Sequence, residues 1–427
     1  MRPAAPLIAL KPALTAIIAG GLAGLIAILT FQLMMGAQHL IWETGAPVEG
    51  PGPVRIVVTI LIGGALLILL ARISPSETVD ELLDDADQPW VQSWKKILLT
   101  ALAATVAVAF GGAIGPEAGL LAVVMGCGAI VSRRIAHSEA RAIAQAGVAG
   151  ALGGLYGSPP AAAAIDGRGD RLTPSKLMSF VAGISGFLVF VYFATNVFGG
   201  HGLAGIPLPQ GREGQDWLVI FPVIVGAFCG IGFRALHGAA DRVTARITRP
   251  WLVTVIGTVL FAALAAALPL VRFSGHDELD DIQTLFAQGE GGQLWLLAAA
   301  KIVAVVLCLS SGWRGGEIFP LIFVGAAAGS ATALLLPDVD PAAAVAGALA
   351  ATITVGWRRP LAALLLLLLL IDLSVAMPLL VGVGAGVALD RIVFGTPDQT
   401  DATDEDAADG AAGDSAEGDD SRPTAAS

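Results

Sequence analysis

One carboxylate stands between glycines and a proline in an apolar part of the chain. Residues 111–121 read GGAIGPEAGLL and contain Glu117, with long apolar runs on both sides. Residues 315–325 read GGEIFPLIFVG, so GGAIGP and GGEIFP share Gly-Gly, Ile and Pro at the same offsets. Keeping a charge among apolar residues costs free energy, which indicates that Glu117 has a function.

Glycine, proline and serine at these breaks predict helix starts that suit an anion. A helix that begins inside the protein presents unpaired N–H groups and the positive end of its dipole, and both attract negative charge. Glycines let backbone amides approach an ion closely, and serine hydroxyls can donate to it. The Ser74-Pro75 pair predicts a third start of this kind. The candidate anion-binding residues are Ser74, Ser76, Gly115, Pro116, Gly316, Glu317, Ile318 and Phe319.

Glu117 is predicted to gate this site. Its carboxylate can occupy the amide-lined position as an anion would, and can leave when it takes up a proton. The alternative is a carboxylate that only stabilises a helix N-terminus. Glu317 either faces the site or pairs with Arg314, and Ser74 is either an anion ligand or only a helix cap.

The composition predicts an all-α protein that crosses a membrane many times. Of the 427 residues, 55% are hydrophobic and only 14% are charged, against about 25% charged residues in soluble domains. Apolar runs of the roughly 20 residues that a span needs recur from end to end. No catalytic triad, metal-ligand spacing or phosphate-binding loop is present, so the sequence predicts neither an enzyme, nor a metal or cofactor site, nor a nucleic-acid partner.

Charge is distributed unevenly along the chain. The net charge is −11, but residues 396–427 hold ten acidic residues and one arginine, so residues 1–395 are close to neutral. These last residues are predicted to be a disordered cytoplasmic tail, behind a transmembrane domain of residues 1–395. Arg234, Arg242, Arg246 and Arg249 predict a cytoplasmic connection, with the acidic loop 275–292 on the opposite face.

Two sets of markers predict an internal repeat. VAGAL occurs at 148–152 and again at 345–349, each time before a polar break and proline-containing small residues. Their separation of 197 residues is close to the 204 residues between Gly111 and Gly315. The predicted halves are roughly 55–200 and 250–395. Apolar segments interrupted by Gly and Pro at corresponding places in two halves indicate the binding site of a transporter.

Four segments in this order resemble the CLC family of chloride channels and transporters. GGAIGPEAGLL resembles the family's Gly-Arg-Glu-Gly-Pro segment, with Glu117 at the position of the gating glutamate and Pro116 where Arg is usual. GGEIFP resembles Gly-x-Phe-x-Pro, with Gly316 and Pro320 retained and Ile318 in the Phe place. LYGSPPAAA and WRRPLAALL resemble the two Ala-Pro-Leu stretches, and ISPSET lies where the anion-binding serine segment belongs.

The resemblance implies an all-α polytopic fold of two inverted-topology repeats with broken and re-entrant helices. It also implies a homodimer in the lipid bilayer, with one pore per subunit and chloride or a similar anion as cargo. The family's inner proton glutamate has no match here; Asp166 and Asp170 are the nearby substitutes. The pore tyrosine of the family's final helix is also missing, since the only tyrosines are Tyr156 and Tyr192.

Three functions follow from these residues. The first is passive, voltage- or pH-gated conduction of anions across the plasma membrane, with Glu117 as the gate. The second is chloride/proton exchange, in which Asp166 or Asp170 carries protons from the inner side. The third, ranked below both, is a cation-coupled solute transporter on another inverted repeat, which would need more polar or aromatic groups at the breaks. Chloride, nitrate and fluoride all remain open as the physiological anion.

Overall fold

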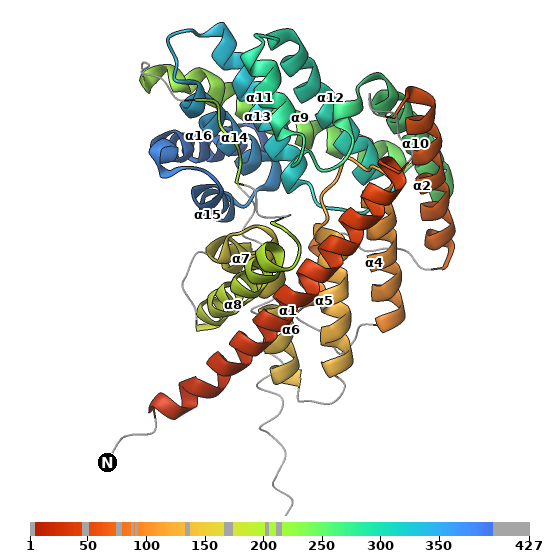
Figure 1. Cartoon of the computed structure of the whole chain (residues 1–427), viewed down its shortest axis with the longest axis vertical. Coiled ribbons are helices and arrows are strands. Elements are labelled where there is room, and N and C mark those ends of the chain that lie inside the picture. The colour runs from red at the N-terminus through yellow and green to blue at the C-terminus, as the bar shows by residue number, and fades with distance from the viewer. Residues whose placement is uncertain are drawn as a thin grey trace, which may run out of the picture.

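The computed structural model describes residues 5–44, 51–73, 79–86, 89, 93–132, 137–165, 174–200, 205–210 and 216–395. Within these ranges the chain is built of helices, and the only pairing of the β type is a single bridge (Figure 1). Ser74, Ser76, Asp166, Asp170 and the acidic residues 396–427 lie outside the described residues. The predicted roles of these residues therefore stay predictions.

The described residues form sixteen α-helices and three short 3-10 turns. In chain order the helices are α1 (Ala5–Trp42), α2 (Pro53–Ile73), α3 (Val79–Asp85), α4 (Trp94–Ala109), α5 (Glu117–Ser132), α6 (His137–Leu155), α7 (Pro159–Ile165), α8 (Pro174–Asn196), α9 (Ile220–Thr244), α10 (Pro250–Ala267), α11 (Leu279–Ala287), α12 (Gly291–Ser310), α13 (Ile318–Leu335), α14 (Pro341–Trp357), α15 (Pro360–Leu370) and α16 (Ala376–Phe394).

Eight helices in the described part are long and apolar enough to cross a membrane: α1, α2, α8, α9, α10, α12, α13 and α16. Helices α5, α14 and α15 are apolar but shorter, as expected of helices that start or stop inside the protein. The apolar window of α13 is 89% buried, whereas those of the other seven are 22–50% buried. Helix α13 therefore lies at the centre of the protein.

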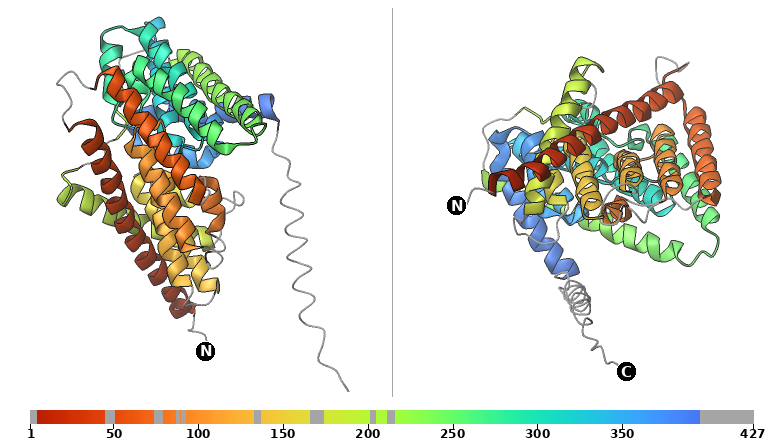
Figure 2. Two further views of the ribbon diagram at one scale, coloured as in Figure 1. Left: turned by 90° about the vertical axis from the view of Figure 1, so that its right-hand side faces the viewer. Right: turned by 90° about the horizontal axis from the view of Figure 1, so that it is seen from below.

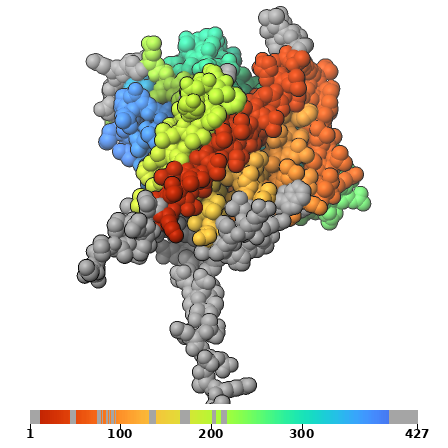
Figure 3. All heavy atoms as spheres, turned by 60° about the horizontal axis from the view of Figure 1, so that its bottom comes forward, coloured from red at the N-terminus to blue at the C-terminus, as the bar shows by residue number. Residues whose placement is uncertain are grey.

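The helices pack in two equivalent sets. Helices α1, α6 and α8 contact one another, as do α9, α14 and α16. In the same way α4 packs on α5 and α12 on α13, while α5 packs on α6 and α13 on α14. Figures 1 and 2 show α4–α8 gathered below and α9–α16 above. Figure 3 shows α1, in red, crossing one face diagonally between α8 and the helices α4 and α5.

Glycines let the helices of each triple approach closely. A Cβ on Gly20 of α1 would lie 2.2 Å from the carbonyl oxygen of Ala182 in α8, and one on Gly150 of α6 would lie 2.4 Å from that of Gly20. In the other triple, a Cβ on Gly226 of α9 would lie 2.1 Å from the carbonyl oxygen of Ala348 in α14. Such backbone-to-backbone contact is typical of packed membrane helices.

The structure matches the residues of the two halves at a different separation from the one that the shared sequence letters indicate. Gly111 and Gly312 both have φ of +90°, at equivalent corners before α5 and α13. They lie 201 positions apart, as do the first residues of α5 and α13, whereas the shared letters match Gly111 with Gly315. The match of GGAIGP with GGEIFP is three residues out of register because proline is accepted both before a helix and in its first turn. Pro116 precedes α5, whereas Pro320 lies inside the first turn of α13.

Candidate functional site

The starts of α5 and α13 meet at the centre of the protein. The amide of Gly115 donates to the carbonyl oxygen of Gly316 at 2.8 Å, and the amide of Gly316 donates back to that of Gly115 at 3.0 Å. This antiparallel bridge joins the two glycine-rich segments that the sequence singled out. Helix α5 begins two residues after the bridge and α13 begins two residues after it as well. Both positive helix ends therefore lie beside one point.

The Glu117 side chain fills that point. It is 0% exposed, although it carries a carboxylate. A Cβ on Gly115 would lie 2.0 Å from Oε2 of Glu117, and a Cβ on Gly316 would lie 2.2 Å from the carboxylate carbon. The carboxylate is therefore packed against the backbone of both glycines. We call this position, bounded by Gly115, Gly316 and the carboxylate, the glycine cradle.

Few polar groups reach the carboxylate in the cradle. The backbone amides of Glu117 and Gly316 and the hydroxyl of Tyr156 face it. None of them makes a well-aligned hydrogen bond in the described part of the chain, where both carboxylate oxygens are buried without a partner. A small anion in the same position would meet amide donors and two helix N-termini, which suit negative charge without a full positive charge.

Tyr156 is the residue that the sequence comparison passed over. It follows the last residue of α6, and the chain turns at Gly157 (φ +61°). The next residue, Ser158, accepts from the amide of Ala161 at 3.3 Å and donates to the carbonyl oxygen of Leu365 at 2.9 Å. These bonds hold the turn between α6, α7 and α15. The Gly-Ser-Pro-Pro break directly after Tyr156 is a sequence signal for this position. The resemblance to the family drew attention to a tyrosine in the final helix and therefore away from Tyr156.

Aromatic rings fix the direction of Tyr156. Its ring centroid lies 5.9 Å from that of Phe319 in the first turn of α13 and 6.5 Å from that of Trp357 at the end of α14. Tyr156 and Phe319 are both buried. The predicted site residue Phe319 therefore supports the position of Tyr156 through its ring, and Ile318 is a buried apolar residue at the start of α13.

The two charged candidates near the cradle have different surroundings. Glu317 precedes the first residue of α13, is half-buried, and its charge acts on Tyr156. Arg314 is attracted to Glu81 of α3. Arg314 therefore links the segment before α13 to the helix that follows the predicted serine segment. Because residues 74–78 lie outside the described residues, the choice between Ser74 and Ser76 stays a prediction.

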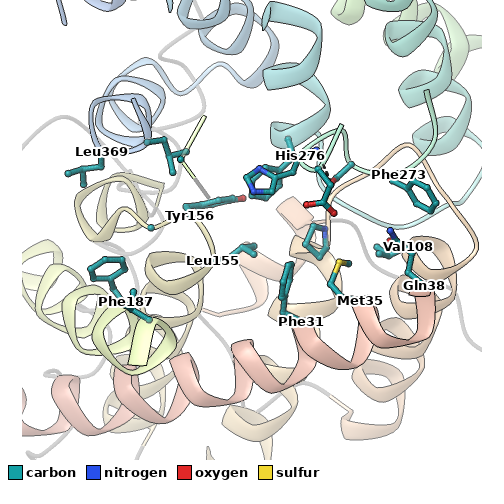
Figure 4. A pocket seen from close by; sticks show the side chains of 18 residues that line it. Phe31, Met35, Gln38, Val108, Leu155, Tyr156, Phe187, Phe273, His276 and Leu369 are labelled. Carbon is teal, nitrogen blue, oxygen red and sulfur yellow. Dashed lines mark hydrogen bonds between the residues drawn. The ribbon is translucent and has the colours of Figure 1, made fainter. Parts of the chain in front are cut away.

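A pocket of about 330 Å³ opens beside the cradle (Figure 4). Helices α1, α4, α6, α8, α13 and α15 and the loop before α11 surround it. Pro116, next to Glu117, contributes to its wall. The other residues that line it are Phe31, Met35, Gln38, Val108, Leu155, Tyr156, Gly157, Phe187, Val191, Gly205, Phe273, Ser274, His276, Asp277, Phe319, Leu369 and Leu370.

A buried lysine holds the loop that forms one wall of this pocket. Nζ of Lys301 in α12 donates to the carbonyl oxygens of Val271, Arg272 and Phe273 at 3.2, 3.0 and 2.9 Å. Lys301 is 0% exposed. The amide of Phe273 in turn donates to the carbonyl oxygen of Gly111 at 3.2 Å, which ties this loop to the segment that carries Glu117.

Known proteins are similar to this chain in sequence or in fold. Residues 76–391 match the family described as "Voltage gated chloride channel". A candidate ion-transport protein, YfeO of Salmonella choleraesuis (strain SC-B67), is 27% identical over 337 residues, which cover 74% of this chain and 79% of YfeO. YfeO of Salmonella newport (strain SL254) matches to the same extent.

Two solved structures have the same fold. A slow cyanobacterial Cl⁻/H⁺ antiporter superposes with a TM-score of 0.72 at 17% identity, covering 93% of this chain and 96% of the antiporter. A CLC-type fluoride/proton antiporter superposes with a TM-score of 0.69 at 15% identity, covering 92% and 97%. The predicted CLC-like, all-α polytopic fold is thereby confirmed.

Proposed function

The chain belongs to the voltage-gated chloride channel family and transports anions across a membrane as a multi-pass integral protein, and from this premise we propose that Glu117 is its gate. Members of this family are transporters and channels rather than enzymes. One observation carries the proposal: the Glu117 carboxylate occupies the glycine cradle at the meeting point of two helix N-termini.

Gating follows from competition for one position. The carboxylate and a free anion both carry negative charge and both suit the amides of the cradle. Because the carboxylate is fully buried there, an anion can enter only after Glu117 has left. Protonation removes the charge that the cradle attracts, so the neutral side chain swings away and the anion takes its place. Acid conditions should therefore increase the anion flux.

The flux is either passive conduction or exchange for protons. Passive conduction needs Glu117 only as a gate. Exchange is favoured by the likeness of the fold to a Cl⁻/H⁺ antiporter and a fluoride/proton antiporter, and it needs a proton path to the inner side, for which Asp166 and Asp170 stay the candidates. The anion is chloride or fluoride in the first instance, and both belong in the test.

Orientation and assembly are part of the same proposal. Arg242 in the last turn of α9 and Arg246 and Arg249 in the connection to α10 form a basic cluster, which favours the cytoplasmic side of the plasma membrane for that connection. Helix α10 has 18 residues and rises about 27 Å, so the loop after it lies on the outer side. Residues 396–427 follow α16 into the cytoplasm, and two copies of the chain form a homodimer.

The test is anion efflux from reconstituted liposomes with the external pH recorded at the same time. Wild-type protein should release chloride or fluoride faster at acid pH, and Glu117→Gln should release it at a rate that no longer depends on pH. Glu290→Gln, an exposed carboxylate before α12, is the matched control and should behave as wild type. Uphill proton movement driven by the anion gradient would establish exchange, and anion flux alone would establish conduction. Unaltered pH dependence in Glu117→Gln would rule out the gate.

A further inference from the structure

The pocket of Figure 4 joins the gate to the loop before α11. Pro116, Tyr156 and Phe319, which border the cradle, line one part of it, and the loop residues Phe273, Ser274, His276 and Asp277 line another. This loop follows α10 at the end opposite to the arginine-rich connection. The pocket therefore lies between the gate and the outer side.

The charge of the pocket does not suit an anion. Among its lining residues the ionised group is the carboxylate of Asp277, and His276 is the group that can gain a positive charge near neutral pH. Among the described residues that line it there is no lysine or arginine. A negative wall lowers the local anion concentration and raises the local proton concentration. The pocket's polarity therefore fits a path for protons.

His276 points into this path. Its ring centroid lies 5.4 Å from that of Phe319, whose ring also contacts Tyr156 at 5.9 Å. Its backbone amide donates to Oγ of Ser274 at 3.3 Å, which fixes the turn. Its Nδ1 is buried and makes no hydrogen bond within the described part of the chain. Because His276 lines the pocket, its ring can exchange protons with water there, and the unpartnered Nδ1 leaves the ring's tautomer unfixed by any described group.

We propose that His276, assisted by Asp277, takes protons from the outer solution and delivers them through the pocket to Glu117. This inference rests on the proposed gating role of Glu117 and adds the group that supplies its proton. In each cycle neutral His276 gains a proton at the outer mouth, and the imidazolium gives a proton to water in the pocket. That water passes one of its protons to the Glu117 carboxylate, past the Tyr156 hydroxyl. His276 is neutral again and Glu117 is uncharged.

The surroundings of His276 determine the pH range in which it takes up a proton. Burial lowers the pKa of His276 below its ordinary value of 6.5, while the charges of Asp277 and Asp280 act to raise it. The described helix residues that line the pocket carry no ionisable acid or base apart from the phenol of Tyr156: they are Phe31, Met35 and Gln38 of α1, Val108 of α4, Leu155 of α6 and Tyr156 after it, Phe187 and Val191 of α8, Phe319 of α13, and Leu369 and Leu370 of α15. His276 is therefore neutral at neutral pH and takes up protons in acid, where the gate opens.

Glu278 lies two residues after His276 and is the other group near this loop that could deliver protons to Glu117. Burial raises its pKa to about 7, and the charge of Lys301 acts against that rise. Glu278 is absent from the residues that line the pocket, and its attraction to Lys301 directs it toward α12. It therefore belongs to the support of the loop, and the experiment has to separate it from His276.

The experiment is an acid jump on proteoliposomes, with anion efflux followed in time. His276→Ala should slow the rise of the flux about tenfold or more, as for loss of a positioned proton donor. Free imidazole in the buffer should restore the fast rise, because the truncated side chain leaves room for it beside the pocket. His237→Ala on α9, a histidine that faces Asp241, should behave as wild type with and without imidazole. In a Glu117→Gln background, His276→Ala should change nothing.

The outcomes separate this inference from the proposed function. If the flux rose as fast in His276→Ala as in wild type, the role of His276 would be overturned and the Glu117 gate would stand. The same would follow if Glu278→Gln slowed the rise in flux more than His276→Ala does. Failure of imidazole to restore a folded His276→Ala protein would do the same, because a structural loss is not repaired by a free base. Wild-type protein that carries no anion at any pH would overturn both.

Discussion

The two halves of the molecule share a backbone but differ in chemistry at corresponding positions. Residues 201 positions apart occupy equivalent places around the cradle. Glu117 begins α5, whereas Ile318 begins α13. Tyr156 follows α6 where Trp357 ends α14, and the turn after each has φ near +60°, at Gly157 (+61°) and Arg358 (+58°). The backbone is repeated, and only the first half supplies the carboxylate that we propose as the gate.

The two halves share the backbone groups that suit an anion, and they differ in the side chains that surround those groups. Both halves give the cradle a glycine and a helix N-terminus, and a helix N-terminus suits negative charge. The first half adds a carboxylate and a phenol, and the second half adds a lysine. Lys301 in α12 corresponds to Thr100 in α4, and both are fully buried. Lys301 holds the loop before α11, so the second half supports one wall of the pocket that we propose as the proton path.

The largest expected effect tests whether the cradle is shared by both halves. Gly115→Ala and Gly316→Ala each place a methyl group within about 2.2 Å of the carboxylate position, where it excludes an anion as well. Overpacking of this kind costs about 1–3 kcal/mol, so anion flux should fall roughly 10- to 100-fold in both variants. Efflux from liposomes measures it. Adding Glu117→Ala should not restore the flux.

Two other glycines serve as controls for the cradle. A Cβ on Gly384 of α16 meets nothing within 4 Å, so Gly384→Ala should transport as wild type does. A Cβ on Gly315 meets the carbonyl oxygen of Gly115 at 2.7 Å, so Gly315→Ala should lower thermal stability as well as flux. Loss of flux in Gly316→Ala but not in Gly115→Ala would show that the second half alone forms the anion site.

A smaller effect is expected from the difference between Lys301 and Thr100. Lys301→Met removes the donor that satisfies three carbonyl oxygens and leaves Glu278 without its buried opposite charge. The cost should be about 3 kcal/mol. Thr100→Val keeps the volume of a buried side chain and should cost about 1 kcal/mol. Thermal unfolding in detergent should therefore place Lys301→Met well below Thr100→Val, and equal midpoints would contradict the support of the loop.

Much of the fold was readable from composition and spacing. Apolar runs gave the membrane spans, and the breaks at Gly115-Pro116 and Gly316 marked the helix starts that meet at the bridge. A glycine at a positive φ and a proline at a helix start are local requirements, so single residues reveal them. Residues 364–393 form one long, mostly apolar run in the sequence, whereas the structure divides this run at Asp372, whose carboxylate accepts from the amide of Ser374 at 2.7 Å. One polar residue in a long apolar run was too weak a signal for that division.

The parts of the site that could not be predicted depend on long-range contacts. Tyr156 reaches Glu117 because the ends of α6 and α14 and the first turn of α13 meet, through the rings of Trp357 and Phe319. Lys301 is separated by about 30 residues from the carbonyl groups it holds. No local pattern specifies such a partner, because the packing of whole helices creates it.

The smallest expected effect concerns the phenol that only the first half supplies. The Tyr156 hydroxyl faces the Glu117 carboxylate and stabilises its charged form in the cradle. Without that donor the carboxylate is displaced more readily, so in Tyr156→Phe the acid-stimulated rise in flux should begin about one pH unit higher. Trp357→Phe keeps an aromatic ring at the corresponding position and should leave the pH profile unchanged. Efflux measured across a pH series decides between them. A shift to lower pH, or equal shifts in the two variants, would mean that Tyr156 acts through packing alone and that Glu117 is the only chemical difference between the halves at the gate.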